Sequence, residues 1–127
     1  MPTIFWKYGF FIHLSIVTII VVSAYLGIIP SVFTVIPFSD LIGHALLIGL
    51  LAFYLDGLLN FRPLIPGKFT FLRLAPILIL LISAIEELAQ SFSSRRTSSM
   101  WDFTADITGI ILLSCLAKLI GRKTSIF

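Results

Sequence analysis

Charged side chains are scarce in this sequence. Asp, Glu, Lys and Arg make up 12% of the 127 residues, whereas 58% of the residues are hydrophobic and the mean hydropathy is +1.09. Soluble domains carry about 25% charged residues, so this chain lacks the polar surface that a water-soluble protein needs. We therefore expect an integral membrane protein in contact with a lipid bilayer.

Cysteine is also nearly absent, because Cys115 is the only one in the sequence. A single cysteine excludes a disulfide framework and any metal site built from several thiolates. Cys115 lies within an apolar run, and we expect it to be a small, buried, unreactive residue. The net charge of +3 does not indicate a nucleic-acid ligand, because the Lys and Arg residues flank apolar segments, a pattern typical of membrane topology.

Four apolar segments are long enough to cross a bilayer, which takes about 20 residues of helix. Prolines and polar residues in the segments between them are expected to end each helix. The predicted fold is an all-α membrane protein, a four-helix antiparallel transmembrane bundle that forms a single domain over residues 1–127. The four expected spans are residues 8–29, 41–59, 72–92 and 101–120.

The distribution of basic residues predicts the orientation of this bundle. With four spans, both termini and the second connection lie on one side of the membrane, and this side collects seven of the nine Lys and Arg residues. Only Arg95 and Arg96 fall on the other side. Positively charged segments stay in the cytoplasm, so we expect both termini to be cytoplasmic. The seven residues are Lys7, Arg62, Lys68, Arg73, Lys118, Arg122 and Lys123.

Most of the acidic residues lie in one stretch, residues 83–109, which holds four of the six. A carboxylate inside a membrane helix costs about 2.5–3.5 kcal/mol on insertion scales, so each needs a partner or a function. On the predicted topology these acids, together with polar residues that open the second span, gather at the extracytoplasmic end. We expect them to line a polar pocket there. Its predicted lining is Asp40, His44, Glu86, Glu87, Gln90, Arg96, Asp102 and Asp106.

These polar residues resemble the motifs of the VanZ-like family, small bacterial membrane proteins named for a teicoplanin-resistance protein. Each motif is a short set of acidic, amide, His or Arg residues at fixed spacing. The resemblance covers about residues 38–115 and keeps the spacing between the second and third motifs. The matching residues are Asp40 and His44, then Glu86, Glu87, Gln90, Phe92 and Arg96, then Asp102, Asp106 and Gly109.

Two positions depart from the family pattern. Leu41 stands where a Lys often follows the first Asp, and Ser94 with Arg95 replaces a Pro-Gly turn. Arg95 could therefore take over part of the role of Arg96. The resemblance implies a cell-envelope protein of the bacterial cytoplasmic membrane, linked in some members to glycopeptide resistance, and it implies no agreed molecular activity.

The residues leave open what the pocket does. It could bind or act on a cell-envelope lipid or glycan headgroup, with Glu87, Asp106 and His44 as the candidate catalytic residues. Carboxylates with one His could also hold a divalent cation. Alternatively, the chain is a small accessory subunit of a larger membrane complex, and its buried acids are structural locks. Its partners could also include a second copy of the chain, as a homo-oligomer. Whether the protein is an enzyme is undecided at this point.

Four further residues are expected to be structural. His13 stands apart from the other polar residues, within the first span. Asp56 lies near the basic second connection, where it could be paired or extend toward the membrane surface. Ala105 and Gly109 form a small-xxx-small pair, which favours close packing of the fourth span against another helix.

Overall fold

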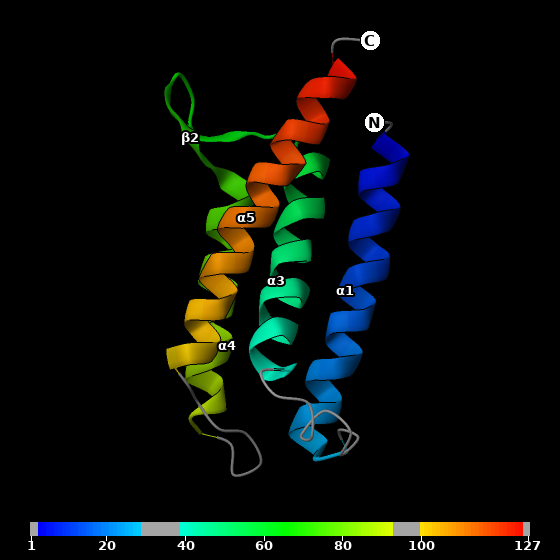
Figure 1. Cartoon of the computed structure of the whole chain (residues 1–127), viewed down its shortest axis with the longest axis vertical. Helices are drawn as coiled ribbons and strands as arrows, with labels where there is room; N and C mark the ends of the chain where they lie inside the picture. Colours follow the sequence, from blue (N-terminus) through cyan, green and yellow to red (C-terminus); the bar gives the residue numbers. More distant parts are fainter. Residues whose placement is uncertain (1–2, 29–38, 93–99, 126–127) are drawn as a thin grey trace.

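A computed structural model of the chain describes residues 3–28, 39–92 and 100–125. Consecutive helices run in opposite directions, and α1 begins at the end of the bundle where α5 finishes (Figure 1). We call this end the terminal end and the opposite end the site end. The helices are α1 (Thr3–Leu26), α3 (Ser39–Leu58), α4 (Leu74–Gln90) and α5 (Met100–Ser125).

Three of these helices, α1, α3 and α5, are long and apolar enough to cross a membrane. Helix α4 has 17 residues. At 1.5 Å per residue it spans about 25 Å, less than the ~30 Å hydrocarbon core of a typical bilayer.

Large apolar side chains cover the outside of the bundle: Ile19 is 66% exposed, Ile85 67% and Leu112 64%. Such a surface is compatible with lipid and supports the prediction of an integral membrane protein.

The second connection is a β-hairpin, which the sequence analysis did not predict. Strand β1 (Pro63–Ile65) pairs antiparallel with β2 (Lys68–Arg73), and Gly67 has a positive φ of 77° in the turn between them. The Pro66-Gly67 pair supplies this turn, because glycine adopts positive φ without steric cost. Leu72 and Arg73 therefore belong to β2, and the third helix begins at Leu74 rather than at the expected residue 72.

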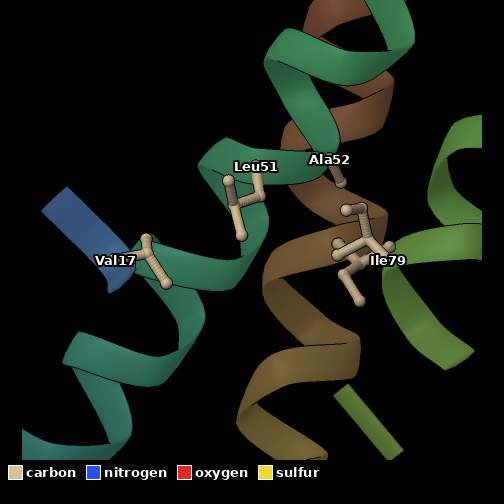
Figure 2. Close-up of a cluster of buried hydrophobic side chains, with 5 residues drawn as sticks. Val17, Leu51, Ala52 and Ile79 are labelled. Carbon is tan, nitrogen blue, oxygen red and sulfur yellow. The ribbon is translucent and has the colours of Figure 1, made fainter. Parts of the chain in front are cut away.

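The middle of the bundle holds a small apolar core to which every helix contributes. Figure 2 shows Val17 from α1, Leu51 and Ala52 from α3 and Ile79 from α4. Ile110 from α5 belongs to the same cluster, and all five residues are at most 7% exposed. Helix α3 is central to this arrangement, because it contacts α1, α4 and α5.

The closest helix contact joins α3 and α5 and depends on glycines. A Cβ atom at Gly109 would overlap the carbonyl group of Ala45, and one at Gly49 would lie 2.7 Å from the carbonyl oxygen of Gly109. The small-xxx-small pair expected on the fourth span thus meets a second such pair, Ala45 and Gly49, on α3. Because the residues at the crossing have no side chain or only a methyl group, the two backbones can touch.

The structure decides two expectations about single residues. Cys115 is exposed on α5 rather than buried, because it lies on the outward face of that helix. Asp56 does not extend toward the membrane surface, since it is completely buried and is ion-paired with Arg73. The alternative that Asp56 is a paired residue is confirmed.

The glycine crossing allows a direct test of the α3–α5 packing. We expect Gly109→Ala to destabilise the protein by about 1–3 kcal/mol, because the added methyl group must displace the backbone of Ala45. Gly43→Ala is the matched control, since a Cβ there meets nothing within 4 Å. Thermal unfolding in mild detergent measures both variants, and equal stability of the two would contradict this account of the crossing.

Candidate functional site

At the site end, His44 of α3 lies between two aspartates of α5. Its Nδ1 is 3.0 Å from Oδ1 of Asp106, and its Nε2 is 3.7 Å from Oδ2 of Asp102. The two aspartates are one helical turn apart, so both point toward the same neighbouring helix. When Nδ1 carries a proton, it donates a hydrogen bond to Asp106, and a doubly protonated imidazolium would be attracted by both carboxylates.

Helix α4 completes the environment of Asp106. The Ser83 hydroxyl donates a hydrogen bond of 2.5 Å to Oδ2 of Asp106, so the carboxylate contacts α3 through one oxygen and α4 through the other. Asp106 is 3% exposed and Ser83 is also 3% exposed. A buried carboxylate is tolerated only where hydrogen bonds replace its water shell, and these two contacts provide them.

A second group of polar side chains joins α1 to α4. The Tyr25 hydroxyl donates to Oε1 of Glu86 at 3.3 Å, and the Gln90 amide donates to Oε2 of the same carboxylate. Glu86 and Gln90 are one turn apart on α4, and their contact agrees with the shared face that their spacing indicates. Tyr25 lies near the end of α1, so all four helices contribute polar side chains at the site end.

The buried face of α4 carries Ser83, Glu87 and Gln90. Glu87 is 8% exposed and Gln90 is fully buried. The Oε1 atom of Gln90 has no hydrogen-bond partner among the described residues. Of the two adjacent glutamates, Glu87 therefore points into the bundle, whereas Glu86 is half-buried and lies toward α1.

Of the eight residues predicted to line the pocket, the structure brings His44, Asp102 and Asp106 into direct contact, and Glu86 contacts Gln90. Glu87 is on the same buried face as Gln90. Asp40 lies in the first turn of α3, and its side chain is outside the described part of the structure. Arg95 and Arg96 also lie outside the described residues.

The described side chains at the site end are predominantly acidic. They comprise four carboxylates, of which Asp102 and Asp106 lie against the one imidazole, so the region favours ligands that donate hydrogen bonds or carry positive charge, such as sugar hydroxyls and amines. No group of three or more His, Cys, Asp or Glu is arranged to hold a metal ion among residues 3–28, 39–92 and 100–125.

Two members of this polar network were missed in the sequence. Tyr25 has no distinguishing local pattern, because its contact with Glu86 joins positions 61 residues apart. Ser83 was noted only as a small residue that permits close packing. A signal for it existed, since Ser83 precedes Glu87 by one helical turn and so shares the inward face of α4.

A second buried ionic contact lies toward the terminal end. Arg73 donates from Nε to Oδ2 of Asp56 at 2.7 Å and from Nη2 to the carbonyl oxygen of Ser114 at 2.9 Å. It therefore links α3 and α5 to the start of α4. The isolated His13 is structural, as expected: its Nε2 lies 2.8 Å from the carbonyl oxygen of Leu47 and ties α1 to α3.

Comparison with known proteins adds no assignment: no protein-family model, curated protein or solved structure matches this chain. The VanZ-like resemblance therefore stays a prediction from the motifs. The proposed function therefore rests on the geometry of the two polar groups at the site end, the one around His44 and the one around Glu86.

The Ser83–Asp106 contact predicts a structural effect that can be measured. Ser83→Ala leaves one oxygen of a buried carboxylate without its donor, and we expect a loss of about 1–3 kcal/mol in the free energy of unfolding. Ser15→Ala is the matched control, because the Ser15 hydroxyl is exposed and bonds to the Phe11 carbonyl of its own helix. That variant should stay within about 0.5 kcal/mol of the parent. A mild effect at both positions would show that the contact contributes little.

The Asp56–Arg73 pair predicts a non-additive double variant. Arg73→Met leaves a buried charge without its partner and should cost about 3–5 kcal/mol. Adding Asp56→Leu removes that charge and should restore most of the loss, since apolar replacements of buried pairs are often neutral. Chemical unfolding of the single and double variants gives the coupling. If the double variant were less stable than Arg73→Met alone, the pair would not act as a unit.

Proposed function

We propose that this chain is a VanZ-like membrane protein whose site end binds a sugar- or amine-bearing headgroup of a cell-envelope lipid or glycan on the extracytoplasmic side. The observation that carries the proposal is the contact of His44 with Asp102 and Asp106, at the same end of the bundle as Glu86 and Gln90. Ionisable side chains inside a membrane protein are costly, and a cluster drawn from several helices is typical of a functional region.

The charge of the cluster favours a sugar over a bare diphosphate. Asp102 presents carboxylate oxygens, which accept hydrogen bonds from hydroxyl and amine groups and repel phosphate oxygens, and the negative charges of Asp106 and Glu86 add to this repulsion. Asp102 and His44 are partly exposed, with side chains 17% and 20% accessible, so a ligand at the end of the bundle can reach them. Asp106 is buried behind them and orients the imidazole.

The proposed orientation follows from basic side chains at the terminal end. Lys7 and Arg62 are exposed there, and Lys118 is half-buried near the end of α5. Positive charge is retained on the cytoplasmic side, so the site end faces outward in a four-span arrangement. The 17-residue α4 crosses the bilayer in this arrangement, with local thinning or adjustment of the lipid around it. A link to glycopeptide resistance fits an outward-facing envelope protein and belongs to this proposal.

A second candidate function is an accessory subunit of a larger membrane complex. One observation favours it: both oxygens of Asp106 already have partners in Ser83 and His44, as a structural lock requires. In that case the polar network holds the helices together and binds no ligand.

Binding to reconstituted protein distinguishes these functions. The probes are a polyprenyl diphosphate that carries an amino sugar and the same diphosphate without the sugar, each added to the full chain in lipid nanodiscs. We expect the sugar-bearing probe to bind, and Asp102→Asn to weaken its binding at least tenfold with little change in melting temperature, because Asp102 is partly exposed. Equal binding of both probes, or of parent and variant, would refute the sugar site.

Thr104→Val is the matched control on the same helix, because the exposed Thr104 hydroxyl bonds only to the Met100 carbonyl. A structural lock predicts the opposite pattern, in which Asp102→Asn and Asp106→Asn lower the melting temperature and no probe binds. Co-purification of a fixed protein partner in mild detergent would then support the accessory subunit.

A further inference from the structure

The β-hairpin at the terminal end is not explained by the proposed function. Figure 1 shows that it projects sideways from the bundle, beyond α5, at the end where α3 finishes and α4 begins. It is formed by β1 and β2 alone, with strands of three and six residues. A two-stranded hairpin of this size is at best marginally stable in water without something to pack against.

Both faces of the hairpin expose apolar side chains. Leu64 is 39% exposed and Ile65 is 46% exposed. Successive residues of a strand point to opposite faces, so these two neighbours place apolar surface on each side. The turn residues Pro66 and Gly67 are exposed as well. An apolar element with no core of its own needs an apolar environment on both sides, which the interface of a bilayer provides.

The charge of the hairpin is entirely positive. No acidic residue occurs between Asp56 and Glu86, whereas Arg62, Lys68 and Arg73 all lie in this segment. Arg73 is ion-paired with the buried Asp56 and is itself buried, whereas Arg62 is exposed. Arg62 is exposed directly before β1, and Lys68 is the first residue of β2.

The position of the hairpin supplies the last step. Because α3 is long and apolar enough to cross a membrane, the end of α3 lies at the membrane surface, and the hairpin follows it directly. We propose that the β1–β2 hairpin is a binding surface for anionic phospholipid, with Leu64 and Ile65 inserted among the acyl chains near the headgroups and Arg62 paired with lipid phosphate. The hairpin thereby anchors the terminal end of α4 at the surface of the anionic leaflet.

Depth measurement tests the insertion. A nitroxide label is attached at Leu64→Cys in a Cys115→Ser background, and the full chain is reconstituted in vesicles of phosphatidylcholine with phosphatidylglycerol. Cys115 of the parent, exposed on α5, calibrates the signal of a lipid-facing position. We expect the label at residue 64 to be accessible to oxygen and shielded from a water-soluble nickel complex. Full accessibility to nickel would overturn the proposal, and so would magnetic coupling between labels of two chains, which would assign the hairpin to a homodimer contact.

Lipid retention tests the charge. Native mass spectrometry of the protein released from mixed nanodiscs gives the ratio of phosphatidylglycerol to phosphatidylcholine that stays bound. Each basic residue near a membrane surface contributes about a fivefold preference, so Arg62→Gln should lower the ratio by about that factor and Arg62→Gln with Lys68→Gln by more. Lys7→Gln is the matched control, because Lys7 is exposed at the same end but on α1. An equal loss in Lys7→Gln would assign the preference to general charge and overturn the role of the hairpin. These outcomes do not depend on the ligand of the site end.

Discussion

The close contact of α3 with α5 is the constraint on which the rest of the structure depends. Gly109 lies against the backbone of Ala45, and Gly49 lies against Gly109, at a distance that no larger residue allows. His44 is next to Ala45, and Asp106 is one turn before Gly109, so the same crossing that joins the backbones also brings the imidazole to the carboxylate. Hydrophobic burial does not drive apolar helices together in lipid, so close packing of this kind is a main source of helix association.

Polar contacts at the two ends of the bundle complement the small apolar core between them. At the site end, Asp106 joins α5 to α3 and α4, and Glu86 joins α4 to Tyr25 of α1. Toward the terminal end, Arg73 joins the start of α4 to Asp56 and to α5. Each of these hydrogen bonds requires a particular direction between donor and acceptor, whereas packing between apolar side chains does not. The ionic groups thus specify the register of helices whose apolar surfaces would tolerate several arrangements.

The two polar regions differ in a way that bears on function. Asp56 is completely buried and Arg73 is 7% exposed, so their pair is closed to ligands in the described structure. His44 and Asp102 are partly exposed, and the 3.7 Å between His44 Nε2 and Asp102 Oδ2 is longer than a hydrogen bond. A region that serves stability alone needs no accessible carboxylate. This contrast is the reason that we propose a binding function for the site end and a structural one for the Asp56–Arg73 pair.

The sequence by itself determined the apolar, helical character of the chain, the approximate places of the four helices that the structure describes and the positions of the acids, because hydropathy and charge are local properties that a membrane selects directly. It also indicated that Gly109 would lie at a helix contact, and that Glu86 would share a face with Gln90, because both follow from helical spacing. Only the tertiary structure decided that Ser83 and Tyr25 join the polar network, that Arg73 is the ion-pair partner of Asp56, and that the second connection forms a hairpin. These features join residues far apart in the chain or depend on strand pairing, and neither is encoded in the periodicity of a single segment.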